Sequence, residues 1–122
     1  MTARLIRNLL NLLAGKSGLM SSTMSLNKAK ILYSSEGRYG HVHYRSSEAS
    51  FAMYYEYGGG DCVACIDIPD SQKWQAHTGL PLERRDAVLD FIGQQVVKDQ
   101  TTGGRGSFRI EKNWLNIYSA RQ

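Results

Sequence analysis

The sequence predicts an α+β fold: a small two-layer domain in which helices pack on one face of an antiparallel sheet. Apolar and polar residues alternate in four short runs in the first half of the chain, and a later segment repeats its apolar residues every three or four positions. With 122 residues, of which 42% are hydrophobic and 21% charged, the chain can build one modest core. We assign residues 28–122 to this domain and residues 1–27 to an N-terminal leader.

The first half of the domain is predicted to form a four-strand meander. Its strands are Ala29 to Ser34, Tyr39 to Arg45, Phe51 to Tyr57 and Cys62 to Ile68. The first turn is expected at Glu36-Gly37, and Gly58 to Asp61 form the last connection. These turns set the register and predict three cross-strand pairs: Ile31 with Val42, Tyr44 with Phe51, and Tyr57 with Cys62.

This register divides the strand residues between two faces of the sheet. The apolar face is expected to hold Ile31, Tyr33, Val42, Tyr44, Phe51, Met53, Tyr55, Ala64, Ile66 and Ile68. The opposite face is polar and aromatic and carries Tyr39, His41, His43, Arg45, Tyr54, Glu56, Cys65 and Asp67, with Leu32, Ala52 and Val63 between them. A slip of one residue would exchange the faces. We expect the second face to be either hydrated or bound to a partner.

Helices and a closing hairpin are predicted after the meander. A short helix is expected at Ser71 to His77, holding Trp74, and a longer one at Leu82 to Asp99. The apolar stripe of the longer helix comprises Leu82, Val88, Leu89, Ile92 and Val96. A C-terminal hairpin then pairs Ser107 to Ile110 with Trp114 to Tyr118. Its expected register sets Glu111 opposite Trp114, which puts Leu115 and Ile117 on one face and Trp114, Asn116 and Tyr118 on the other.

The leader carries most of the net positive charge. Residues 1–23 contain Arg4, Arg7 and Lys16 and no acidic residue. The rest of the chain has 12 basic and 11 acidic residues, so its formal charge is +1, compared with +4 for the whole chain. A near-neutral body argues against extensive contact with a phosphate backbone.

Four interpretations of residues 1–27 stay open. Leu5, Ile6, Leu9, Leu10, Leu12 and Leu13 share one side of a helix, which suits a docking helix or weak membrane-surface contact through residues 4–13. The acid-free composition also suits organelle targeting through residues 1–23, and a simple upstream extension is the fourth reading. No apolar run is long enough to span a membrane, and two cysteines make no disulfide framework. The default expectation is a reduced, cytoplasmic protein.

A non-catalytic binding or interaction protein is the leading functional hypothesis, with a protein partner or self-association through the polar and aromatic face. The candidate surface residues are Tyr39, His41, His43, Arg45, Tyr54, Glu56, Asp67 and Trp74. For Trp74, a partner anchor competes with a side chain that fills the edge of the core.

Two alternatives use the same face. His41, His43, Cys65 and Asp67 are residue types that bind metals or transfer protons, which would suit a metal-binding protein or metal-dependent enzyme. Tyr39 and Tyr54 could stack on the nucleobases of a single-stranded nucleic acid. Few lysine or arginine residues accompany them, however, so nucleic-acid binding is disfavoured. We expect no cofactor, because the sequence has no phosphate-binding glycine loop and no recognisable catalytic set.

Cys62 and Cys65 have the C-x-x-C spacing of zinc half-sites and redox pairs. They lie within a predicted strand, where residues three apart point to opposite faces. We therefore expect two buried or half-buried thiols, with a metal or redox role as the alternative.

Overall fold

The computed structural model describes residues 28–120. The predictions for the leader, including its amphipathic helix, targeting role and membrane contact, fall outside the described residues. Within the described part of the chain, no helix is both long and apolar enough to cross a membrane.

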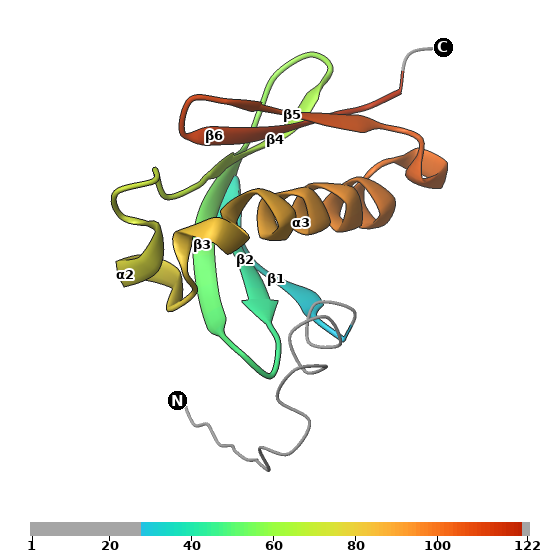
Figure 1. The fold of residues 1–122 in the computed structure, drawn as a ribbon. Helices are drawn as coiled ribbons and strands as arrows, with labels where there is room; N and C mark the ends of the chain where they lie inside the picture. The colour runs from blue at the N-terminus through green and yellow to red at the C-terminus, as the bar shows by residue number, and fades with distance from the viewer. Residues whose placement is uncertain (1–27, 121–122) are drawn as a thin grey trace.

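The predicted α+β architecture is confirmed (Figure 1). The meander consists of β1 (Lys30–Glu36), β2 (Tyr39–Arg45), β3 (Ser50–Tyr57) and β4 (Cys62–Asp67). The helical segment consists of α2 (Trp74–Thr78), the 3-10 turn η1 (Leu82–Arg84), α3 (Arg85–Gln100) and the 3-10 turn η2 (Thr102–Gly104). The closing hairpin consists of β5 (Ser107–Glu111) and β6 (Trp114–Tyr118).

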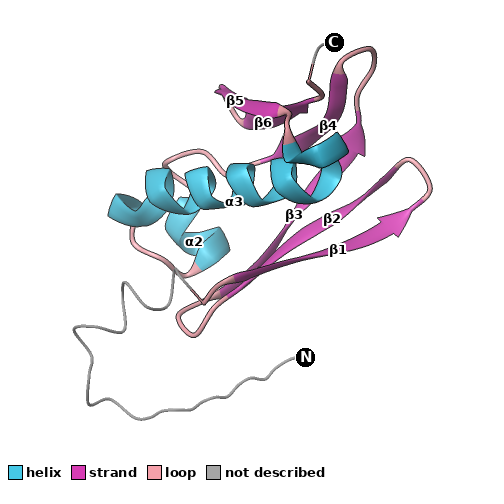
Figure 2. Cartoon of the chain, turned by 90° about the vertical axis from the view of Figure 1, so that its right-hand side faces the viewer, coloured by secondary structure: helices cyan, strands magenta, loops and turns pink. Residues whose placement is uncertain are grey.

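All six strands belong to one antiparallel sheet in the order β1-β2-β3-β4-β6-β5. After β4 the chain passes through the helices, returns along β5 at the edge of the sheet, and turns into β6, which pairs with β4. Figure 2 shows α2 and α3 on the same side of the sheet. The hairpin therefore extends the meander, and the helices cover one face of the sheet.

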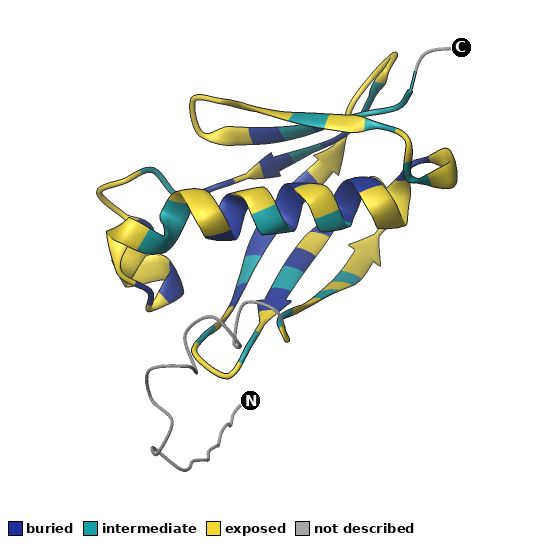
Figure 3. Cartoon of the chain, turned by 45° about the vertical axis from the view of Figure 1, so that its right-hand side comes forward, coloured by how far each residue is buried: buried dark blue, intermediate teal, exposed yellow. Residues whose placement is uncertain are grey.

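The inner side of α3 follows the predicted apolar stripe, except at its start. Val88, Leu89, Ile92 and Val96 are buried, and the buried bands of α3 face the strands in Figure 3. Leu82, however, is 48% exposed. It lies in η1, ahead of the first residue of α3, and a 3-10 turn rotates by about 120° per residue instead of 100°. Leu82 therefore does not line up with the buried apolar residues of α3.

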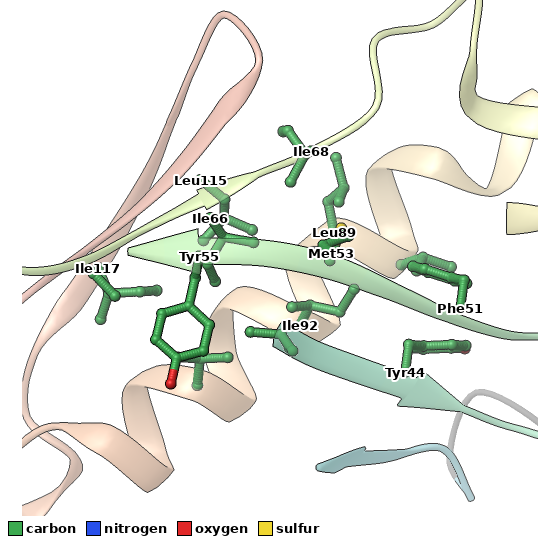
Figure 4. Close-up of a cluster of buried hydrophobic side chains, with 14 of the residues drawn as sticks. Tyr44, Phe51, Met53, Tyr55, Ile66, Ile68, Leu89, Ile92, Leu115 and Ile117 are labelled. Carbon is green, nitrogen blue, oxygen red and sulfur yellow. The ribbon is translucent and has the colours of Figure 1, made fainter. Parts of the chain in front are cut away.

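The core lies between α3 and the predicted apolar face of the sheet (Figure 4). Eight of the ten residues assigned to that face are buried: Val42, Tyr44, Phe51, Met53, Tyr55, Ala64, Ile66 and Ile68. The other two, Ile31 and Tyr33, are partly buried against the core. The division of the sheet into two faces is thus confirmed.

The predicted register between β1 and β2 is wrong by two residues. Glu36 pairs with Tyr39, so the turn is Gly37-Arg38, and Ile31 faces Tyr44 instead of Val42. Gly37 has φ of +81°, a conformation that favours glycine at the first central position of a tight hairpin turn. The expected turn placed this glycine second.

The β3–β4 register is also wrong by two residues, whereas the other predicted pairs are confirmed. Tyr57 faces Ala64 instead of Cys62. Tyr44 with Phe51 is observed as predicted, and the C-terminal hairpin also has the expected register. Both slips are by an even number of residues, so they move no side chain to the other face. A β-bulge between Cys62 and Ala64, seen in the pairing of β4 with β6, does so instead: it brings Cys62 to the polar face and packs Val63 against the core, where Val63 was expected on the polar face.

Candidate interaction face of the sheet

The face of the sheet opposite the helices is the candidate site, and we call it the open face. Alternation along the strands and the pairing between them assign to it Lys30, Leu32, Ser34, Glu36, Tyr39, His41, His43, Arg45, Ser50, Ala52, Tyr54, Glu56, Cys62, Cys65, Asp67, Ser107, Arg109, Glu111, Trp114, Asn116 and Tyr118. Seven of the eight predicted surface residues belong to it.

An aromatic strip of Tyr39, His41, His43 and Tyr54 crosses β2 and β3 on the open face. The ring centroids of Tyr39 and Tyr54 are 5.9 Å apart, and those of His41 and Tyr54 are 6.1 Å apart. His41 lies 6.3 Å from His43 by the same measure. The rings are neighbours because His41 and Tyr54 are cross-strand partners and the other two residues lie two positions from His41.

His43 joins the strip to β1. Its Nε2 lies 3.1 Å from the Ser34 hydroxyl oxygen, and its cross-strand partner is the exposed Leu32. Partial burial lowers the pKa of His43 below its ordinary value, and the charges of Arg45 and His41 lower it further. At neutral pH His43 is therefore an uncharged imidazole beside an apolar side chain.

Tyr54 supplies a neutral hydroxyl at the centre of the strip. Desolvation raises the pKa of its phenol, and Glu56 and Tyr39 raise it further. The phenol stays protonated at neutral pH and can donate a hydrogen bond. Tyr54 and His43 thus give the strip two neutral rings that each carry a polar atom.

The charged residues of the open face are mixed in sign. Its bases are Lys30, Arg45 and Arg109, and its acids are Glu36, Glu56, Asp67 and Glu111. A surface that binds a phosphate backbone needs more basic than acidic residues around its aromatic rings. The open face has no such excess.

The predicted metal set is not brought together. Cys65 pairs with Glu56 of β3 and Asn116 of β6, and Asp67 pairs with Trp114 of β6. The two histidines lie on β2, on the far side of β3. Among residues 28–120, no three His, Cys, Asp or Glu side chains are arranged to hold a metal ion.

Trp74 does not belong to the interaction face. Its side chain is fully buried, its Nε1 donates a hydrogen bond to the Pro81 carbonyl at 3.1 Å, and its ring meets the Phe51 ring at 6.0 Å between centroids. It fills the core between α2 and β3, so the core reading of this residue is the correct one.

Trp114 is a member of the open face that the sequence did not place there. The alternation of β6 points it away from the buried Leu115, and it is 37% exposed. The sequence indicated the two faces of the hairpin but not which strand the hairpin would join. Only the pairing of β6 with β4 puts Trp114 on the same surface as the aromatic strip.

The two cysteines lie on one face, contrary to the prediction. The bulge between Cys62 and Ala64 pairs Cys62 with Tyr118 and Cys65 with Asn116, both on the open face. Their sulfur atoms are 3.5 Å apart. Burial raises the pKa of the Cys65 thiol to about 11, and the hydrogen bond and charge of Cys62 and the charge of Glu56 add to this.

No protein-family model, curated protein or solved structure matches this chain. Function is therefore inferred from the geometry of the open face and of its cysteines.

Proposed function

We propose that this domain is a non-catalytic binding module that takes a protein partner, or a second copy of itself, on the open face. The observation that carries this proposal is the gathering of large exposed side chains on one surface. Leu32 is 42% exposed, Tyr39 43%, Tyr54 37% and Trp114 37%. Tyrosine and tryptophan supply much of the binding energy at protein interfaces, because each buries a large ring and keeps one polar atom for a hydrogen bond.

The aromatic strip is also held in place before binding. Its rings stand on paired strands and contact each other across them, and His43 is hydrogen-bonded to Ser34. Side chains that are already ordered lose little conformational entropy on association. A partner therefore meets a surface that needs little rearrangement.

The charge pattern supports a protein over a nucleic acid. Acidic and basic residues lie at opposite ends of the aromatic strip: Glu36 and Glu56 pair with Tyr39 at one end, and Lys30 pairs with Arg45 at the other. Interfaces between proteins commonly have an apolar centre with a polar rim of mixed charge. The same arrangement would repel as many phosphates as it attracts.

The test removes the two central rings without touching the core. We would compare the full chain with a Tyr39→Ser/Tyr54→Ser variant by sedimentation velocity over a range of micromolar concentrations, and by affinity capture from extracts of the source cells. The matched control is Asp90→Ser/Gln94→Ser, two residues that are exposed and hydrogen-bonded to each other on α3, away from the open face. Unchanged thermal unfolding would show that each variant is folded.

We expect self-association or a specific captured protein with the wild type and the α3 control, and at least a tenfold loss with the double tyrosine variant. Binding that is equally strong in both variants would refute the proposal. A wild-type chain that stays monomeric and captures nothing would refute it as well.

A further inference from the structure

A pair of thiols lies where the β3–β4 loop enters β4. The Cys62 and Cys65 sulfur atoms are 3.5 Å apart, and both residues are half-buried and free. In a regular strand, residues three apart would point to opposite faces. The bulge between Cys62 and Ala64 advances β4 by one extra residue against β6, and this brings both thiols to the open face.

The local backbone fixes the position of Cys62. A side-chain carbon at Gly58 would lie only 2.7 Å from the Cys62 sulfur, so the glycine leaves the space in which this thiol lies. The Gly58 N–H donates to the Val63 carbonyl at 3.3 Å, and the Cys62 N–H donates to the Gly59 carbonyl at 3.0 Å. The loop therefore holds Cys62 next to Cys65 through its backbone.

We propose that Cys62 and Cys65 form a redox-active dithiol that closes to an intramolecular disulfide by exchange with a low-molecular-weight disulfide of the glutathione class. The sulfur atoms must approach from 3.5 Å to about 2.05 Å. Zinc binding accounts for this pair less well than disulfide formation does, because two thiolates supply only half of the ligands of a tetrahedral site. Within residues 28–120, no third His, Cys, Asp or Glu joins them. This site does not depend on the partner binding proposed above.

The exchange takes place in two steps. The Cys62 thiolate attacks one sulfur of oxidised glutathione, which breaks the glutathione disulfide, forms a mixed disulfide on Cys62 and releases one glutathione thiolate. The Cys65 thiolate then attacks the Cys62 sulfur and displaces the second glutathione thiolate. The released thiolates take up the protons lost by the two cysteines, so two protein thiols and one glutathione disulfide become one protein disulfide and two glutathione thiols.

The surroundings of the two thiols assign their order. With its pKa raised to about 11, Cys65 is protonated at neutral pH and can donate its S–H to a Cys62 thiolate. We assign the attack to Cys62 and the resolving step to Cys65, and the Cys65→Ser variant below tests this order. Once Cys62 is in a mixed disulfide, its negative charge is gone, and one cause of the raised pKa of Cys65 is removed.

The experiment treats the reduced full chain with oxidised glutathione at about pH 8, blocks the remaining thiols by alkylation, and measures the intact mass. We expect a product that has lost two hydrogens and carries neither glutathione nor an alkyl group. The mixed disulfide should stay below about a tenth of the protein, because the second step is intramolecular. Cys65→Ser should stop at the mixed disulfide on Cys62.

The matched control, Cys62→Ser/Val63→Cys, keeps two thiols but moves one by a single position. Val63 packs against the core, so the moved thiol points away from Cys65 and no intramolecular disulfide should form. Wild-type protein that keeps two alkylatable thiols, takes up two glutathiones or forms disulfide-linked dimers would overturn the proposal. If the control does not fold, accumulation of the mixed disulfide in Cys65→Ser but not in the wild type decides the question.

Discussion

Replacing Gly93 with alanine tests how closely α3 packs on the C-terminal hairpin. A side-chain carbon at Gly93 would lie 2.6 to 2.7 Å from three ring carbons of Phe108 in β5. Alanine in a helix is favoured over glycine by roughly 0.5–1 kcal/mol. Inserting a methyl group into a packed site costs about 1–3 kcal/mol. Because the overlap involves the root of the Phe108 ring as well as its edge, we expect a net loss of unfolding free energy on the order of 1 kcal/mol.

A double-mutant cycle separates the overlap from the helix propensity. In a Phe108→Ala background the ring is absent, and Gly93→Ala should stabilise the protein by roughly 0.5–1 kcal/mol. Urea unfolding followed by circular dichroism gives the four free energies. An alanine that stabilises the wild type, or that has the same effect in both backgrounds, would refute the close approach of α3 to β5.

Two further predictions concern hydrogen bonds and protonation. The lowered pKa of His43 means that the folded protein binds a proton there less readily than the unfolded chain, whose histidine titrates near 6.5, so unfolding free energy should fall as pH drops from about 7.5 to 5. His43→Gln should show a shallower fall by urea titration, and parallel curves would contradict this. Thr101→Val should lower the free energy of unfolding by about 1–3 kcal/mol, because it removes two buried hydrogen bonds. The Thr101 hydroxyl donates to the Val97 carbonyl at 2.7 Å and accepts from the Gly106 N–H at 3.0 Å. The exposed neighbour Thr102, changed to valine, should cost less than about 0.5 kcal/mol, and equal costs would argue against the role of Thr101.

The two faces of the sheet could be predicted from the sequence because they depend only on the alternation of residues. The register errors at β1–β2 and β3–β4 moved Ile31 and Tyr57 to new partners but left them on the same face. The choice of turn could not be fixed in the same way. Placing Gly37 first or second in the turn changes the register by two residues, and the alternation is satisfied in both cases.

The site features that the sequence missed depend on contacts between distant segments. The bulge that brings the Cys62 and Cys65 thiols to the same face is defined by the pairing of β4 with β6, about fifty residues later in the chain. The sequence of β4 itself carries no signal for this bulge. Trp114 reaches the open face through the same pairing. The burial of Trp74 depends on how α2 docks on β3, which the periodicity of a five-residue helix cannot indicate.

The most direct test of the two-faced sheet compares neighbouring residues of β3. Met53 is 2% exposed beneath α3, whereas Tyr54 points to the open face. We expect Met53→Ala to lower the free energy of unfolding in urea by about 2–5 kcal/mol, because the side chain that it removes is fully buried. Tyr54→Ala should cost less than about 1 kcal/mol. A Tyr54→Ala variant that loses as much unfolding free energy as Met53→Ala would show that the open face is part of the core.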